Sequence, residues 1–197
     1  MKRLLLLVSC FVCAGAFAQD ADKAIESVKE KLALDDRTSV FDVKAVPTNG
    51  PTVLTGETSV PQAKEELLGM LKEQGIETID AITLLPDKKA LDGKIYGVIR
   101  IPVGTLRYGP SYASEQATQL LMGTPVRILK KEGWYLVQTP EDYVSWVSSS
   151  SVEPMTRQQF NEYLSHKKLI FLSDEGWIYE KPDASSARIA SVVVGAL

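Results

Sequence analysis

Two cysteines and a single histidine are the residues of this 197-residue chain that could supply a nucleophilic thiol and its base: Cys10, Cys13 and His166. A cysteine thiolate is activated when a neighbouring histidine takes its proton. Both cysteines lie in an apolar N-terminal segment, and His166 stands in a polar segment beside two lysines, without metal-ligand spacing. The sequence also has no glycine-rich phosphate loop, G-x-S-x-G elbow or paired-histidine zinc motif. We therefore predict that this chain by itself has no catalytic residue, metal site or cofactor.

Residues 1–18 have the order of a secretory signal peptide: a basic start, an apolar run and then small residues that end at Ala18. This order predicts cleavage after Ala18 and export to the periplasm or cell envelope. The apolar run is too short to span a bilayer stably. A second interpretation is that L-V-S-C, which ends at Cys10, is a lipoprotein cleavage box with Cys10 as the lipidated residue.

Signal cleavage after Ala18 would change the charge and leave the mature chain without a thiol. The 22 basic side chains become 20, because Lys2 and Arg3 leave with the signal, and the 25 acidic ones stay, which gives a net charge of −5. A mildly acidic chain has no general electrostatic attraction to nucleic acid or to anionic lipid. We therefore predict that it does not bind nucleic acid.

Residues 20–87 have the pattern of a small α+β domain. Apolar residues at helical spacing predict a helix over Ala21 to Leu34, and alternation predicts strands over Phe41 to Ala45 and Thr52 to Gly56. A second helix is expected to begin at Pro61, and a third strand to cover Ile76 to Leu85. This order predicts two helices packed on one face of a small sheet.

The phrase K-A-V-P-T-N-G-P-T-V-L-T-G-E-T, followed by a helix and a strand, resembles a BON domain. That module occurs in exported bacterial proteins and is linked there to membrane or envelope attachment. The resemblance implies a BON-like two-layer α/β sandwich over residues 20–87. The alternative is a generic two-layer α+β domain whose strand pair and helix serve only to pack. Pro86 to Lys94 is predicted to be the linker between this domain and the next one.

Residues 95–154 carry short apolar runs at the spacing of a small β-barrel. Pro125 to Leu129 and Trp134 to Val137 flank a charged turn that ends at Gly133, and Tyr143 to Val147 forms a third run. Short alternating strands with glycine and proline between them predict a closed or nearly closed barrel. Gly133 is expected to adopt a positive φ in a hairpin.

The phrases T-L-R-Y-G-P-S, G-T-P-V-R-I-L-K-K-E-G-W-Y-L-V and D-Y-V-S-W-V resemble a bacterial SH3-like domain. With E-Q-A-T-Q-L-L-M-G ahead of the central phrase, the stretch is similar to the first of two SH3-like domains that precede the catalytic domain in NlpC-type cell-wall peptidases, the γ-D-glutamyl-L-diamino acid endopeptidases. The resemblance covers Tyr96 to Leu197. It implies that the parent protein is a cysteine peptidase that hydrolyses peptidoglycan, with its Cys/His catalytic domain outside this sequence.

Residues 155–197 are expected to hold a linker helix and the start of a second SH3-like domain. Lys168 to Leu172 and Trp177 to Tyr179 flank a turn and predict a hairpin, with Ala190 to Val194 as the next strand. About 40 residues are too few to close a second barrel, and a terminal apolar strand without a partner would be an exposed edge. We therefore expect a fragment, a truncated gene product or a chain that a partner completes.

The resemblance also implies two ligand-binding residues. In members of the family, a Glu within E-x-x-T-Q and a Tyr within G-Y-x-G-W help to hold the free α-amine of the peptide's N-terminal L-Ala. The matching residues are Glu115 in E-Q-A-T-Q and Tyr143 in D-Y-V-S-W. A carboxylate neutralises an ammonium group, and a phenol oxygen accepts one of its remaining donors. Asp142 and Ser145 replace the two glycines, and Ser145 is expected to change how closely a ligand can approach the backbone.

Simpler interpretations of both residues stay open. Glu115 could be a surface carboxylate in a short helix, and Tyr143 a packing aromatic beside Trp134 and Trp146. Three functions follow from these choices. The chain is the targeting and substrate-recognition region of a secreted muropeptide endopeptidase, a stand-alone envelope protein that binds cell-wall peptides, or a purely structural interaction module.

Overall fold

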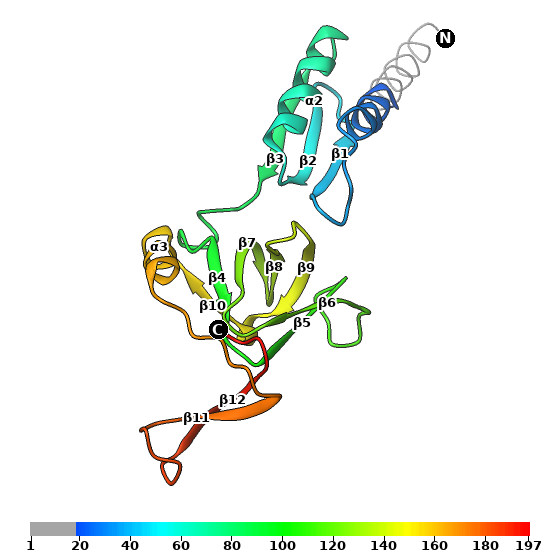
Figure 1. The fold of residues 1–197 in the computed structure, drawn as a ribbon. Coiled ribbons are helices and arrows are strands. Elements are labelled where there is room, and N and C mark those ends of the chain that lie inside the picture. The colour runs from blue at the N-terminus through cyan, green and yellow to red at the C-terminus, as the bar shows by residue number, and fades with distance from the viewer. Residues whose placement is uncertain (1–18) are drawn as a thin grey trace, which may run out of the picture. The chain divides into compact units, whose positions relative to one another are not determined.

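The computed structural model describes residues 19–197 and divides the chain into two compact units, one that ends at Leu85 and one that begins at Pro86 (Figure 1). The predicted signal peptide, with Cys10 and Cys13, lies outside the described residues. Within residues 19–197, no helix has the length and apolar character needed to cross a membrane.

The first unit contains a three-stranded sheet in the order β1 (Phe41–Val46), β2 (Thr52–Thr58) and β3 (Thr78–Leu84). β1 and β2 pair antiparallel, whereas β2 and β3 pair parallel. Parallel neighbours need a crossover connection, and α2 (Pro61–Glu73) supplies it. An N-terminal helix, described over residues 19–31, precedes the sheet.

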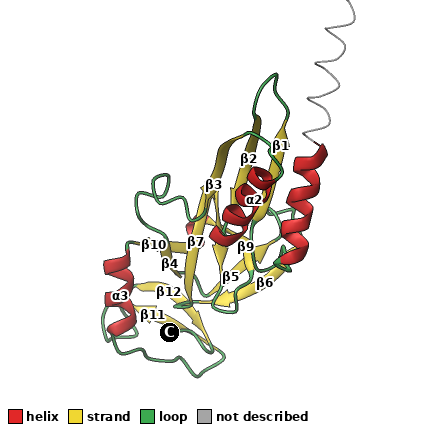
Figure 2. Ribbon diagram, turned by 90° about the horizontal axis from the view of Figure 1, so that it is seen from above, coloured by secondary structure: helices red, strands yellow, loops and turns green. Residues whose placement is uncertain are grey.

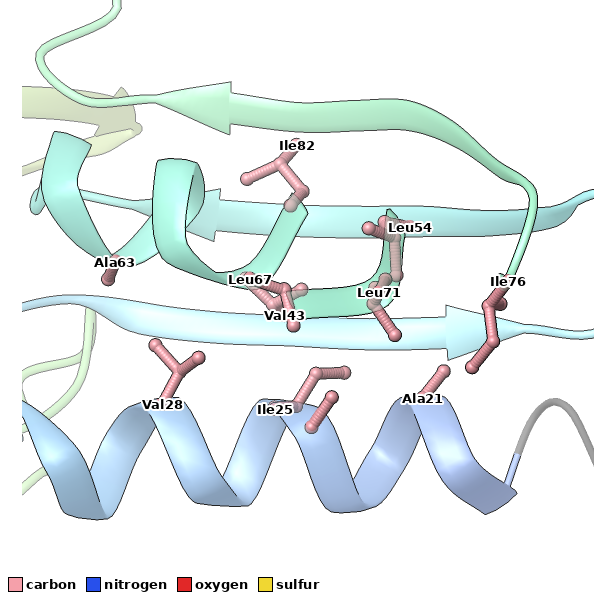
Figure 3. Close-up of a cluster of buried hydrophobic side chains, with 11 residues drawn as sticks. Ala21, Ile25, Val28, Val43, Leu54, Ala63, Leu67, Leu71, Ile76 and Ile82 are labelled. Carbon is pink, nitrogen blue, oxygen red and sulfur yellow. The ribbon is translucent and has the colours of Figure 1, made fainter. Parts of the chain in front are cut away.

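Both helices of the first unit bury an apolar stripe in one shared core (Figure 3). The N-terminal helix and α2 pack with the inward-facing strand residues Val43, Leu54 and Ile82. The helices contribute Ala21, Ala24, Ile25, Val28, Ala63, Leu67 and Leu71. Pro61 occupies the first turn of α2, as predicted. The predicted mixed α+β character is confirmed, although the N-terminal helix ends before Leu34.

The second unit is built on a seven-stranded sheet in the order β10-β4-β7-β8-β9-β5-β6, in which the neighbours pair antiparallel. Its inner face forms one core around fully buried Leu106, Ile128, Val137 and Val147. Gly133 has a φ of 72° in the β7–β8 hairpin, as predicted. The strands are β4 (Tyr96–Ile99), β5 (Val103–Arg107), β6 (Gln116–Leu121), β7 (Pro125–Glu132), β8 (Trp134–Gln138), β9 (Val144–Ser148) and β10 (Val152–Met155).

The segment predicted to be a linker is folded onto this sheet. Leu91 is buried in the core of the second unit, and the Asp87 N–H donates to the Leu129 carbonyl oxygen over 3.1 Å. The Asp87 carboxylate accepts hydrogen bonds from the N–H groups of Lys89 and Ala90, which fixes the turn. The apolar Leu91 among charged residues was the signal that this segment has a packed side.

α3 (Arg157–Ser165) follows β10 and lies beside β4 and β10 (Figure 2). A capping box of Thr156 and Gln159 begins the helix, each side chain satisfying a backbone N–H of the other. The Tyr163 hydroxyl donates to the Gly123 carbonyl oxygen over 2.7 Å. These bonds hold α3 against the seven-stranded sheet.

The C-terminal hairpin uses strands other than those predicted. β11 (Glu175–Tyr179) pairs antiparallel with β12 (Arg188–Val193), whereas residues 168–172 form no strand. The prediction of an unpartnered terminal strand is wrong. β12 has β11 as its partner, and the Leu197 N–H beyond it donates to the Met122 carbonyl oxygen over 3.0 Å. Gly195 makes this return possible with a φ of 85°, which few other residues adopt.

Candidate functional site

Glu115 lies at the end of the loop that joins β5 to β6. It immediately precedes β6, and its side chain is exposed. Its carbonyl oxygen accepts a hydrogen bond from the Tyr108 N–H over 3.1 Å, which continues the β5–β6 ladder by one pair. Glu115 is therefore not in a short helix, although it is at the surface, as that alternative expected.

Tyr143 immediately precedes β9 and is 37% exposed. Its N–H donates to the Thr139 hydroxyl oxygen over 3.2 Å, and its carbonyl oxygen accepts from the Thr139 N–H over 2.9 Å. The aromatic ring that packs on Trp134 belongs to Tyr112, with centroids 4.7 Å apart. The turn of residues 139–143 thus fixes the backbone of Tyr143, and a different tyrosine fills the packing role.

Glu115 and Tyr143 each precede a strand that pairs with β5, one on either side of it. β6 and β9 both run antiparallel to β5, with Arg107 opposite Gln116 on one side and Trp146 on the other. Glu115 and Tyr143, which precede β6 and β9, therefore lie toward the end of the sheet at which β5 finishes, with Tyr143 three residues beyond the Trp146–Arg107 pair. No hydrogen bond joins the two side chains within the described part of the chain, because β5 separates their strands. The fold brings the two predicted residues to one rim without direct contact.

A groove of about 300 Å³ opens beside the turn of residues 139–143. Its walls come from β4, β7, the end of β8, this turn and α3. They include the rings of Tyr96 and Phe160 and the charged side chains of Arg127 and Asp142. Sequence analysis missed this groove, because its residues come from segments far apart in the chain. Only the T-R-Q-Q phrase at the start of α3, a capping box, was a local signal for one of its walls.

The aromatic wall of the groove is a stacked pair. The rings of Tyr96 and Phe160 have centroids 4.7 Å apart and planes 15° from parallel. The Arg157 guanidinium lies 5.0 Å from the centre of the Tyr96 ring, within the range of a cation–π interaction. Burial raises the pKa of Tyr163, whose protonated hydroxyl helps to hold α3 in place. The aromatic wall is therefore held by both a strand and a fixed helix.

Asp142 occupies a left-handed backbone conformation with a φ of 67°. Its N–H donates to the Thr139 carbonyl oxygen over 3.0 Å, which closes the turn. Residues other than glycine seldom adopt such an angle, although aspartate does so more readily than most. A glycine in the resembled G-Y-x-G-W phrase suits this angle. Asp142 adopts it here and adds a carboxylate to the groove.

Ser145, which replaces the second glycine of that phrase, is only 2% exposed. Its hydroxyl oxygen is buried without a hydrogen-bond partner among the described residues. The prediction that Ser145 changes the approach of a ligand to the backbone is therefore wrong, because its side chain points into the sheet's interior.

The other residues of catalytic type do not form a site in the described structure. His166 is exposed at the C-terminal end of α3, where its N–H donates to the carbonyl oxygens of Glu162 and Tyr163. Among residues 19–197, no three His, Cys, Asp or Glu side chains gather in an arrangement that could hold a metal ion.

Residues 106–152 match the family model of the bacterial dipeptidyl-peptidase Sh3 domain. This range contains both Glu115 and Tyr143, and it covers the sheet from the end of β5 to the first residue of β10. The predicted SH3-like character of this part of the chain is confirmed. A search of curated proteins found no match.

Several solved structures, among them the following two, are similar to this chain. One is described as a novel NlpC/P60 endopeptidase from Photobacterium damselae subsp. piscicida, at 15% identity and a TM-score of 0.42 over 57% of this chain and 27% of that one. The other is NlpC2 from Trichomonas vaginalis, at 19% identity and a TM-score of 0.29 over 51% of this chain and 36% of that one. The chain spans little more than a third, at most, of these structures.

Proposed function

We propose that this chain is the targeting and substrate-recognition region of a secreted peptidoglycan endopeptidase, and that it binds cell-wall peptides with a free N-terminal L-Ala. The observation that carries the proposal is the position of Glu115 and Tyr143 on one rim of the seven-stranded sheet. Both residues lie within the stretch that matches the Sh3-domain family.

The chemistry of the rim suits an ammonium group. The exposed Glu115 carboxylate supplies a negative charge and acceptor oxygens, and the Tyr143 hydroxyl supplies a further acceptor. An ammonium group has three donors and no acceptor, so these groups satisfy both its charge and its hydrogen bonds. Acetylation of the amine removes the charge and two of the three donors, and should therefore abolish recognition.

The remaining parts of the proposal concern the rest of the parent protein. A C-terminal NlpC-type domain would supply the catalytic cysteine and histidine. The order of residues 1–18 supports export to the periplasm or cell envelope. The helix, strand, strand, helix, strand order of the first unit supports a BON-like domain that attaches the protein to the envelope.

Calorimetric titration of the mature chain with L-Ala-γ-D-Glu-diamino acid peptide tests the proposal. We expect Glu115→Gln to weaken binding by roughly 10- to 100-fold, because hydrogen bonds to charged groups contribute about 1.5–3 kcal/mol. Tyr143→Phe removes a single hydroxyl and should weaken binding by about tenfold or less. The N-acetylated peptide should not bind measurably.

Glu175→Gln is the matched control, because Glu175 is also exposed at the start of a strand, but in the C-terminal hairpin. It makes the same change in net charge and should leave the affinity unaltered. Equal affinity for the free and the acetylated peptide would overturn the proposal, as would equal effects of the two Glu→Gln variants.

A further inference from the structure

We propose that the outer face of β8 and β9 binds a neutral saccharide, a chain of β-linked pyranose rings. The site is the Tyr112–Trp134 platform, which consists of these two rings and the hydroxyl groups of Ser148 and Ser150. It shares no residue with the groove or with the amine site at Glu115 and Tyr143. Saccharide binding there adds a second class of ligand and does not depend on the proposed function.

β8 and β9 place Trp134 and Ser148 side by side on the outer face of the sheet. The two residues are directly opposite each other in the antiparallel pair. Successive side chains of a strand point to opposite faces, and Val137 and Val147 lie in the core. Trp134 and Ser148 therefore point away from the core. Tyr112, from the loop between β5 and β6, contacts both of them, so two strands and a loop form one surface.

Tyr112 is exposed and yet held in place. Its ring lies edge to face against the ring of Trp134, with centroids 4.7 Å apart and planes 65° apart. Its hydroxyl oxygen lies 3.2 Å from the Oγ of Ser148, within hydrogen-bonding distance. The residue is nevertheless 72% exposed. A ring that is already fixed loses little conformational freedom when a ligand covers it.

The loop that carries Tyr112 is fixed by its own hydrogen bonds. The Arg107 guanidinium donates to the Ser114 carbonyl oxygen over 2.6 Å. The Ser114 N–H donates in turn to the Ser111 carbonyl oxygen over 3.1 Å, and the Ala113 N–H donates to the Ser111 hydroxyl oxygen over 3.2 Å. These bonds close the loop on both sides of Tyr112. The platform therefore has its shape before a ligand arrives.

The charges beside the platform favour a ligand without net charge. Glu132 of β7 is directly opposite Trp134. Its carboxylate forms an ion pair with Lys130 over 3.0 Å, and the Lys130 ammonium group lies 5.2 Å from the centre of the Trp146 ring. Because these two opposite charges neutralise each other, a charged ligand gains no ion pair with them.

The hydroxyl groups of the platform favour a saccharide over the other neutral ligand that aromatic surfaces bind, a proline-rich peptide. Tyr112, Ser148 and Ser150 form a chain of hydroxyl groups with O···O distances of 3.2 and 2.9 Å. Each hydroxyl has one donor and two lone pairs, so the chain keeps a donor and several lone pairs for a ligand. Sugar hydroxyls both donate and accept, whereas a proline has no N–H to donate.

The shape of a β-linked pyranose ring matches this arrangement. Its equatorial hydroxyl groups lie around the edge, and its axial C–H groups give it flat apolar faces. An apolar face can stack on an aromatic ring while the edge hydroxyls reach polar groups beside it. The rings of Tyr112 and Trp134 supply the first surface, and Ser148 and Ser150 supply the second.

NMR titration of the folded mature chain with chitotetraose and cellotetraose, two neutral β-1,4-linked chains, tests the platform. We expect the Trp134 indole N–H and the Tyr112 amide to shift at millimolar saccharide. Tyr112→Ala should weaken binding by roughly three- to tenfold, because the aromatic contact is lost. Tyr112→Phe keeps the ring and removes one hydroxyl, so it should weaken binding by about two- to threefold.

Tyr108→Ala is the matched control. Tyr108 belongs to the same loop and is 58% exposed, but within residues 19–197 its ring does not pack on Trp134. Its removal should leave the affinity for the saccharides unchanged. Decaproline, a neutral peptide without side-chain hydroxyl groups, should cause no shift at the platform. The amide spectrum of each variant verifies that it is folded.

The outcomes separate the platform from the amine site. No shift at Trp134 and Tyr112 with either saccharide would overturn the platform, as would equal losses in Tyr108→Ala and Tyr112→Ala. Shifts with decaproline in place of the saccharides would assign the surface to a proline-rich peptide instead. Glu115→Gln should leave saccharide binding unaltered, so a failure of amine recognition at Glu115 is seen independently.

Discussion

The seven-stranded sheet and the C-terminal hairpin use similar residues with opposite results. Ile128 in β7 is completely buried, whereas Ile189 in β12 is 64% exposed and Trp177 in β11 is 48% exposed. Seven strands that curve around one core give each strand an inner face. The two paired strands of the hairpin have no further strand beside them, and Val192 is the one side chain of β12 that is buried. Burial of an apolar side chain here therefore depends on how many strands share a core, rather than on the composition of one strand.

The same difference explains where the candidate site lies. Its residues lie on or beside strands that are hydrogen-bonded to neighbouring strands, and on a helix with a capping box. After the hairpin, the chain end returns to the sheet, where the Leu197 N–H donates to the Met122 carbonyl oxygen. A recognition site needs the more rigid of these two supports.

The largest expected effect contrasts two isoleucines. Ile128→Ala should lower the free energy of unfolding by about 2–5 kcal/mol, because it leaves a cavity in a packed core. Ile189→Ala should change it by about 0.5 kcal/mol or less, because that side chain is already exposed. Urea denaturation of both variants measures the difference. Similar losses would mean that Ile189 is packed in solution, and would contradict the difference in burial between the sheet and the hairpin.

The next effect tests the attachment of the chain end to the sheet. Gly123 has a φ of 88°, and a Cβ there would lie 2.5 Å from the Leu197 Cβ and 2.9 Å from the Leu197 carbonyl oxygen. Gly123→Ala should cost about 1–3 kcal/mol and release Leu197, seen as faster amide exchange at Leu197. Gly133→Ala is the control, since Gly133 also has a positive φ but no atom within 4 Å of the added Cβ. Unchanged exchange at Leu197 in Gly123→Ala would contradict the contact.

A smaller effect concerns the hydroxyl that holds α3. Tyr163→Phe removes its hydrogen bond to Gly123 and should lower stability by about 1 kcal/mol. Burial raises the pKa of Tyr163, so its contribution is fully present below the unfolded-state pKa of about 10 and is lost as the pH rises through the folded-state value. The unaltered chain should therefore lose this stability in alkali, whereas Tyr163→Phe should not. The assignment would be contradicted if the melting temperatures of the unaltered chain and of Tyr163→Phe fell equally as the pH is raised above about 10.

The smallest expected effect lies in the loop between β11 and β12. Hydrogen bonds from the backbone and the side chain of Ser185 lower the pKa of Asp183 below 3.8. A lowered folded-state pKa means that the local stabilisation is present above the unfolded-state pKa and is lost as the pH falls through the folded-state value. The Ser185 amide resonance should shift with this midpoint in NMR titration, and Asp183→Asn should abolish the shift. A midpoint at or above 3.8 would show that the loop is not ordered by these bonds.

Local features of the fold were predictable because they depend on near neighbours. Pro61 begins α2 and Gly133 turns the β7–β8 hairpin, as expected from the backbone angles that these residues favour. The hairpin at the chain end was predicted with the wrong strands. Lys168 to Leu172 has apolar residues of strand type, but β11 pairs instead with β12, and no local pattern distinguishes these two pairings.

From the sequence alone it was possible to predict an α+β part followed by an SH3-like part. The sequence also supplies a carboxylate at Glu115 and a phenol at Tyr143, the types of group that can bind an ammonium group. Only the tertiary structure decided that these residues share a rim, because that follows from the pairing of β9 and β6 with β5. It also decided the groove, where β4, β7 and α3 bring Tyr96, Arg127 and Phe160 together. Contacts between distant segments depend on which strands pair and how the sheet curves, and a linear pattern of residues does not contain that information.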